Sequence, residues 1–168
     1  MIKFTNVVCA LIFLSVPNLV LANGNWGREV HVDQMSDEET VWYWVENLQP
    51  FSCSGGSSKA RLYLTCTING AAALLGTTNC IFDEEVFSFR VDDQQKEMVW
   101  ATPQGSGQSV HLGSVVNKSN ADHLVKVVAT GRKLLLQIDP VSSSLATVEF
   151  KIDGLKDSVG SDFFDCLP

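Results

Sequence analysis

Apolar and polar residues alternate with a period of two along several stretches of the chain, which is the pattern of β-strands that bury one face. The alternation is clearest over Arg61–Ile68, and it recurs over Glu85–Val91 and Ala146–Ile152. The segment Thr40–Glu46 is β-branched and aromatic and predicts another strand. No strand–helix–strand rhythm runs through the chain, so the pattern favours an antiparallel sheet.

Shorter segments complete the expected order of elements. Asn69-Gly70 predicts a two-residue hairpin turn that returns the chain along Ala71–Gly76, because both residues tolerate positive φ. Further strands are expected at Glu97–Ala101, Ser109–Gly113 and Lys133–Asp139, helices at 119–131 and Leu155–Phe164, a loose lead at Asn23–Arg28 and a loop at Pro50–Lys59. The predicted fold is mainly β, an antiparallel β-sandwich or open barrel with one or two short helices.

The first residues carry the features of a cleavable export signal. Lys3 precedes the apolar run Val7–Val16, and Val20 and Ala22 fit a cleavage site. The run is about ten residues long, half of what a membrane-spanning helix needs. We therefore predict that residues 1–22 are a signal peptide and that residues 23–168 form a single β-rich domain, periplasmic or secreted.

The chain is acidic, with a formal net charge of −7 at pH 7. An acidic surface disfavours nucleic acid and anionic membranes as partners, whereas a protein with a basic patch is compatible with it. No second apolar stretch approaches membrane-spanning length, so no membrane span is expected after signal cleavage. The expected partner is a protein of the cell envelope.

Four cysteines lie beyond the predicted signal peptide, Cys53, Cys66, Cys80 and Cys166. An even number of cysteines in an exported chain suggests disulfides. The chain has no C-x-x-C pair and its three histidines are scattered, so no metal site, redox motif or cofactor is expected.

The predicted hairpin constrains which cysteines can pair. With the turn placed as above, Cys80 lies past the open end of the hairpin, beside Cys53, and Cys66 lies near the closed end. Because bridged Cα atoms lie within about 7 Å of each other, this placement favours Cys53–Cys80 and leaves Cys66–Cys166. The alternative is that Cys66 is a buried free thiol, since it falls on the apolar face of its strand.

Two groups of residues are candidate binding sites. Arg90, Asp92 and Asp93 form one possible binding patch, although a strand end followed by a charged turn gives the same pattern. Trp42 and Trp44 share one face of their predicted strand, and the residue between them points the opposite way. One face of this strand is expected to be core; a pair of exposed tryptophans would instead suit a protein partner or a stacked glycan.

No catalytic residues are predicted. A Ser-His-Asp site is formally possible, but no G-x-S-x-G motif or comparable context surrounds a serine. Paired carboxylates carry little weight as a catalytic signal, because 19 acidic residues always place some near others. We therefore expect a non-catalytic protein.

Five segments, in order along the chain, resemble those of a known family of exported proteins. They are Met35–Val41, Leu62–Asn69 around the central cysteine, Phe89–Asp93, the late pair 138–140 and 150–155, and Cys166. Together they resemble the VasI/TagO family of type VI secretion accessory proteins, of which this chain looks like a divergent member. The resemblance implies a role through protein contacts, with the secretion apparatus as a partner.

Two other functions fit the same features. A small, acidic, disulfide-bonded β domain also suits a periplasmic inhibitor or an immunity-type binding protein. A cell-wall hydrolase fits less well, because the sequence nominates no catalytic group.

Overall fold

The computed structural model describes residues 25–53, 55–67, 70–83, 85–113, 118–141 and 143–167. The predicted signal peptide, residues 1–22, lies outside these ranges, as does Asn69 of the predicted turn. Within them the chain forms strands β1 (Gly27–Val32), β2 (Glu39–Glu46), β3 (Phe51–Cys53), β4 (Gly56–Ser58), β5 (Ala60–Thr67), β6 (Gly70–Thr77), β7 (Glu85–Val91), β8 (Glu97–Gln104), β9 (Ser109–Leu112), β10 (Lys133–Ile138) and β11 (Ala146–Lys151). The helices are α1 (Lys118–Thr130), α2 (Leu155–Ser158) and the 3-10 helix η1 (Ser161–Phe164).

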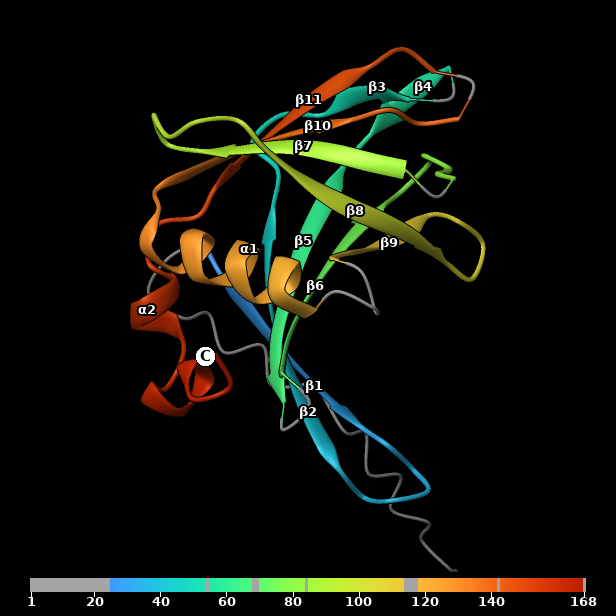
Figure 1. The fold of residues 1–168 in the computed structure, drawn as a ribbon. Coiled ribbons are helices and arrows are strands. Elements are labelled where there is room, and N and C mark those ends of the chain that lie inside the picture. The colour runs from blue at the N-terminus through green and yellow to red at the C-terminus, as the bar shows by residue number, and fades with distance from the viewer. Residues whose placement is uncertain are drawn as a thin grey trace, which may run out of the picture.

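Nine of the described strands form one antiparallel sheet in the order β1-β2-β5-β6-β9-β8-β7-β10-β11, and β3 and β4 form a separate small hairpin (Figure 1). The sheet curves back on itself. Asn47, just after β2, forms an isolated bridge with Phe150 of β11, and the Leu48 amide donates to the Glu149 carbonyl at 2.9 Å. The prediction of a mainly β, antiparallel sandwich or open barrel with short helices is therefore confirmed, and the contact between the two ends of the sheet is that of an open barrel.

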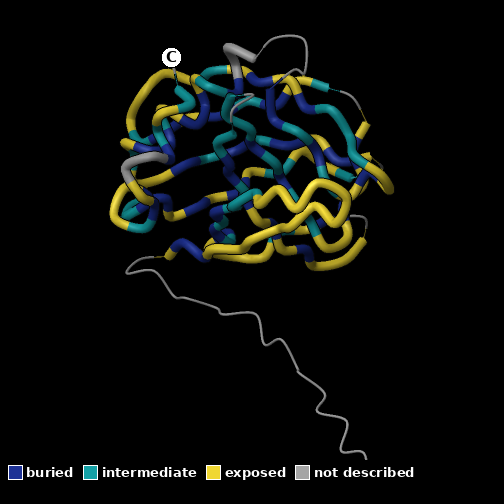
Figure 2. The backbone as a smooth tube through the Cα atoms, turned by 90° about the horizontal axis from the view of Figure 1, so that it is seen from below, coloured by how far each residue is buried: buried dark blue, intermediate teal, exposed yellow. Residues whose placement is uncertain are grey.

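Alternate residues of the strands point into this barrel and form the core. Leu62 and Leu64 of β5 are fully buried, and Phe87 and Phe89 of β7 are nearly so. Figure 2 shows the result along the backbone, where buried and exposed positions follow one another in short steps. The strands predicted from the period-two pattern are thus confirmed, with ends that shift by a few residues.

Helix α1 covers part of the interior and packs against β6 and β8 (Figure 1). Its buried side chains Leu124, Val125 and Val128 follow the spacing of one helical face. Asp122 accepts a hydrogen bond from the Ala71 amide at 3.1 Å and so ties the helix to β6. The predicted helix is confirmed, including its end just before Gly131.

The C-terminal segment differs from the single predicted helix over Leu155–Phe164. It is divided into α2 and η1, because Val159 adopts extended backbone angles between them. Phe163 of η1 packs edge-on against Tyr43, with ring centroids 5.2 Å apart, and this contact docks the segment on the barrel.

Two further predictions of irregular structure are wrong in part. The expected loose lead at Asn23–Arg28 ends in β1, which takes up Gly27 and Arg28, while residues 23 and 24 lie outside the described ranges. The expected loop at Pro50–Lys59 contains β3 and β4. From Arg28 on, every residue of β1 is exposed, and β3 and β4 have three residues each. Strands that bury no face, or that have only three residues, show no recognisable alternation of apolar and polar residues.

The central hairpin has a register shifted from the predicted one. Thr67 pairs with Gly70, so the connecting residues are 68 and 69 and not Asn69-Gly70. Cys66 consequently faces Ala71, two residues earlier than predicted. The shift is an even number, so the residues predicted to face the core still do so.

Strands β1 and β2 extend beyond the barrel as a projecting hairpin (Figure 1). We call residues 30–41 the arm. In chain order, β2 begins to pair with β5 only at Trp42. Its pairing with β1 starts earlier, at Glu39 opposite Val32, so the arm consists of β1 and β2 alone. The arm's tip is held by Asp33, whose carboxylate accepts hydrogen bonds from the amides of Met35 at 2.7 Å and Ser36 at 3.1 Å. These two bonds lower the pKa of the Asp33 carboxyl, because they favour its charged form.

Candidate binding surface

Both predicted disulfides are present. Cys53 pairs with Cys80 across a Cα–Cα distance of 5.5 Å, and Cys66 pairs with Cys166 across 5.7 Å. The alternative of Cys66 as a free thiol is thereby excluded. The first bridge fastens the β3–β4 hairpin to the end of β6, and the second fastens the C-terminus to β5.

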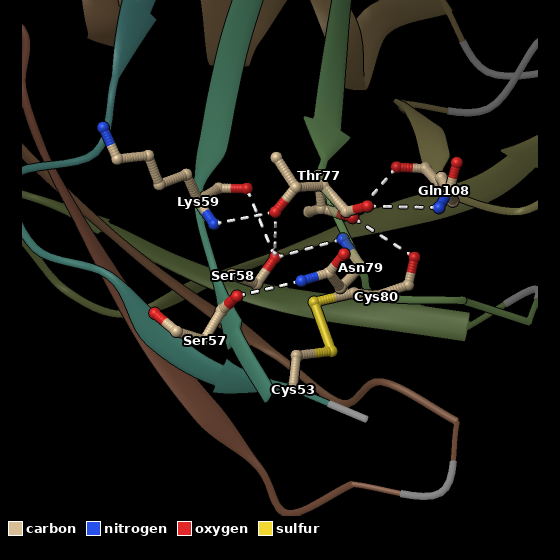
Figure 3. Close-up of a disulfide and its surroundings, with 9 residues drawn as sticks. Cys53, Ser57, Ser58, Lys59, Thr77, Asn79, Cys80 and Gln108 are labelled. Carbon is tan, nitrogen blue, oxygen red and sulfur yellow. Dashed lines mark hydrogen bonds between the residues drawn. A yellow bond between two sulfur atoms is a disulfide. The ribbon is translucent and has the colours of Figure 1, made fainter. Parts of the chain in front are cut away.

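Hydrogen bonds surround the Cys53–Cys80 bridge (Figure 3). The Asn79 side chain donates to the Ser57 carbonyl at 2.9 Å, and the Asn79 amide donates to the Ser58 hydroxyl at 3.4 Å. The Thr77 hydroxyl donates to the Gln108 carbonyl at 3.0 Å. These bonds join β4, the end of β6 and the start of β9, so this disulfide region is a structural corner of the barrel.

Arg90, Asp92 and Asp93 do not form one patch. Asp92 accepts hydrogen bonds from the backbone amides of Arg132 at 3.2 Å and Lys133 at 2.9 Å, and its own φ is 48°. This carboxylate therefore fixes the turn after β7 against the start of β10. Asp93 lies with Asp92 at the edge of a cleft of about 360 Å³. Arg90 is instead on the outer face of β7, opposite Leu135.

Trp42 and Trp44 lie on the outer face of β2. Tyr43 and Val45 between and beyond them are buried, which confirms that one face of this strand is core. The indole of Trp44 lies over Gly27 and under the Arg61 guanidinium, whose carbon is 4.5 Å from the ring centroid.

Trp42 meets another aromatic ring on the same outer face. It packs edge-on against Tyr63, with ring centroids 6.5 Å apart. The two tryptophans are thus half-buried in a local aromatic cluster. The groove that Arg90 lines contains neither tryptophan, so Trp42 and Trp44 do not join Arg90 in one site.

The outer face of β7 and β8 carries an exposed apolar group that the sequence did not single out. Val86, Met98 and Trp100 expose 42, 72 and 47% of their surface. Val86 pairs directly with Trp100 across the two strands, and Met98 pairs with Ser88, next along β7 on the same face. We call these three residues the β7–β8 patch.

A shallow groove of about 190 Å³ adjoins the patch on the side of β10. Arg90 and Lys96 line it together with Leu135 and Gln137. The Lys96 ammonium donates to the Gln137 side-chain oxygen at 2.9 Å. The groove therefore has an apolar floor and two cationic groups, beside three exposed apolar side chains.

Two titratable groups outside the patch are shifted by burial. Burial raises the pKa of the Glu85 carboxyl, and the nearby carboxylates of Asp139 and Asp83 raise it further. Burial also lowers the pKa of the His111 imidazole, which is half-buried on the outer face of β9. Both shifts disfavour the charged form of a group that is taken out of water.

The described part of the chain carries neither a metal-binding cluster nor a membrane-spanning helix. No group of three or more His, Cys, Asp or Glu side chains in it is arranged to hold a metal ion. None of the helices in these ranges is both long and apolar enough to span a membrane.

Fold and surface define a disulfide-bonded, antiparallel β-barrel protein with one helix packed against the sheet and a hairpin arm. Comparisons of the chain with family models, with curated proteins and with solved structures gave no match.

Proposed function

We propose that this is a non-catalytic, exported binding protein of the cell envelope that acts by contacting another protein. The β7–β8 patch is the observation that carries the proposal. Contiguous exposed apolar side chains mark interaction sites on soluble proteins, and tryptophan and methionine are enriched at such interfaces. Trp100 lies beside Val86 on a strand paired on both sides, so the backbone that carries these side chains is in place before binding.

Two further features support the proposed location and partner. Disulfides persist in oxidising compartments, and both bridges of this chain are consistent with export by the predicted signal peptide. The resemblance to the VasI/TagO family favours a component of the type VI secretion apparatus as the partner. Arg90 and Lys96 beside the patch favour a partner surface that is apolar with an acidic rim.

Affinity purification of the tagged, exported protein from its own organism tests the proposal. Cross-linked partners are identified for the wild-type chain, for Trp100→Ala and Met98→Gln, and for the control Met35→Gln. Met35 is 95% exposed but lies at the tip of the arm, between β1 and β2, at the other end of the sheet order. Secretion-apparatus proteins should be recovered by the wild type and the control, and roughly tenfold less by the patch variants.

Three results would contradict this function. Equal recovery by the patch variants would remove the patch as the binding surface. Specific recovery of a toxin or a lysozyme-like enzyme would identify an inhibitor or immunity-type protein instead. Muralytic activity of the purified chain that disappears when one carboxylate is changed would identify a cell-wall hydrolase.

A further inference from the structure

Strand β1 leaves one edge of the sheet open. It is an edge strand, the first in the sheet order, and among the described residues it pairs with β2 alone. All residues from Arg28 to Val32 are exposed. An edge strand of this kind presents unpaired N–H and C=O groups to any strand of suitable sequence.

The sequence of β1 is complementary to itself. In an antiparallel pair of two β1 strands centred on Val30, Glu29 of each copy lies opposite His31 of the other, and the two Val30 side chains lie opposite each other. The Glu–His pairs stand on one face of the ladder and the valines on the other. Cross-strand pairs of β-branched residues and pairs joined by side-chain hydrogen bonds stabilise a sheet, and an imidazole N–H can donate to a carboxylate.

We propose that two copies of this chain form a symmetric dimer by antiparallel pairing of their β1 strands, centred on Val30. One two-fold axis passes through this residue, so each contact occurs twice. Charged residues on an edge strand ordinarily prevent such pairing, because like charges meet. Here the register places each carboxylate against an imidazole.

The acidic tips of the two arms stay apart in this arrangement. Because the strands are antiparallel, the tips point in opposite directions, and Asp33, Asp37 and Glu38 of one copy do not face those of the other. Each tip instead approaches the base of the other copy's β1. At that base the indole N–H of Trp26 donates a hydrogen bond to the carbonyl of Ile152, the residue after Lys151.

The dimer goes beyond the proposed function and does not depend on it. Four strands, β2, β5, β6 and β9, separate β1 from β8 in the sheet, so the β7–β8 patch does not take part in the β1 pairing. A contact made mainly by one pair of short strands is smaller than a standard interface, so we expect association in the micromolar range or weaker.

Sedimentation equilibrium of the exported, disulfide-bonded protein, from about 1 µM to 1 mM to span that range, tests the dimer. A concentration-dependent monomer–dimer equilibrium is expected. His31→Glu should raise the dimer dissociation constant roughly tenfold, because it sets two glutamate pairs face to face. Glu29→Lys should also weaken the dimer. The double variant Glu29→Lys with His31→Glu should restore at least the wild-type dissociation constant, since lysine then faces glutamate.

Val30→Pro provides a second, independent variant because proline cannot donate to a strand ladder. It should leave a monomer, with its near-ultraviolet circular dichroism showing whether the barrel is intact. The inference is overturned by a wild-type chain that stays monomeric at 1 mM, by a dimer that persists in folded Val30→Pro, or by a double variant no tighter than either single one. In all three cases partner recovery through the β7–β8 patch can still be observed, which separates the two proposals.

Discussion

The hydroxyl of Thr65 donates a hydrogen bond to the carbonyl oxygen of Val41 at 2.7 Å. Thr65 is the last residue of β5 that pairs with β2, and Val41 is the first residue of β2 beyond that ladder. At the base of the arm, where the backbone hydrogen bonds between β2 and β5 end, the Thr65 side chain therefore supplies a further hydrogen bond. This side chain is buried, because Thr65 is only 2% exposed.

Thr65→Val should therefore loosen the base of the arm. Valine keeps the shape of threonine but leaves the Val41 carbonyl without this donor, which costs about 1–2 kcal/mol of unfolding free energy. Urea denaturation measures the loss, and hydrogen exchange should accelerate most in residues 30–41. Thr147→Val, on the outer face of β11, is the control and should change the unfolding free energy by less than about 0.5 kcal/mol. Unchanged exchange in the arm would show that the hydroxyl does not hold its base.

Gly27 is required where the Trp44 indole crosses β1. An added Cβ at Gly27 would overlap Cε2 and Cζ2 of that ring. Gly27→Ala should displace the indole from beneath Arg61, shift the tryptophan fluorescence to longer wavelength and cost about 1–3 kcal/mol. Gly56→Ala is the matched control, because an added Cβ there meets its nearest atoms at 4.0 Å. Equal stability of the two variants would contradict the overlap.

Much of this fold was predictable because its strands bury one face. The period-two pattern of Arg61–Ile68 and Ala146–Ile152 led to the observed strands β5 and β11. The disulfide pairing was predictable even though the hairpin register was shifted, because both registers place Cys80 past the open end of the hairpin. Strand β1 was missed because its side chains are exposed beyond Gly27.

The β7–β8 patch was not predictable for a different reason. In the segment Met98–Ala101 both faces of β8 are apolar, so the alternation does not say which face is core. Packing decides that Val99 and Ala101 are buried while Met98 and Trp100 are exposed. Arg90 and Asp92 have even spacing, but Asp92 leaves the strand for a turn with positive φ. The backbone therefore separates residues that the sequence places together.

Asp92 and Asp93 should respond differently to substitution. Asp92→Ala removes the acceptor for the Arg132 and Lys133 amides and places alanine at a φ of 48°, so we expect a loss of about 2–3 kcal/mol. Asp92→Asn should cost less, because asparagine can still accept one of these bonds and tolerates this backbone region. Asp93→Ala should change the unfolding free energy by less than about 0.5 kcal/mol. Thermal or urea unfolding ranks the three, and an equal effect at both positions would show that the turn, not the Asp92 bonds, matters.

The two disulfides should differ in their susceptibility to reduction. Cys53 and Cys80 are completely buried, whereas Cys66 and Cys166 are half-buried. Limited reduction under native conditions, followed by alkylation and peptide mass mapping, should therefore label Cys66 and Cys166 first, because the thiol reagent must reach a sulfur. Simultaneous labelling of all four cysteines would indicate global unfolding as the step that exposes both bridges.

Removal of the Cys66–Cys166 bridge should destabilise the whole barrel. It joins residues 100 positions apart, and closing a loop of that length restricts the unfolded chain by about 4–5 kcal/mol. Cys66→Ala with Cys166→Ala should lose a large part of this free energy in urea denaturation. The Cys53–Cys80 bridge spans 27 positions, so its double alanine variant should lose less through the unfolded chain, about 3.5 kcal/mol. A larger loss for the shorter loop would show that native packing around Cys53 outweighs chain entropy.

Glu85 should make the protein less stable as the pH rises. Its Oε1 atom is buried without a hydrogen bond among the described residues, and burial together with Asp139 and Asp83 raises the pKa of its carboxyl. The folded chain therefore binds this proton more tightly than the unfolded chain does. The resulting stabilisation is complete below the unfolded pKa and is lost as the pH rises through the raised, folded pKa.

Glu85→Gln should remove that dependence. The variant should match the wild type near pH 4 and should be the more stable of the two at pH 7 to 8, where the stabilisation from the bound proton of Glu85 is lost. Unfolding free energies across this pH range provide the measurement, with Glu149→Gln on the exposed face of β11 as the control. Parallel curves for the wild type and Glu85→Gln would contradict the raised pKa. A wild type more stable than the variant at pH 8 would contradict it as well, because burial and the two neighbouring carboxylates both act in the opposite direction.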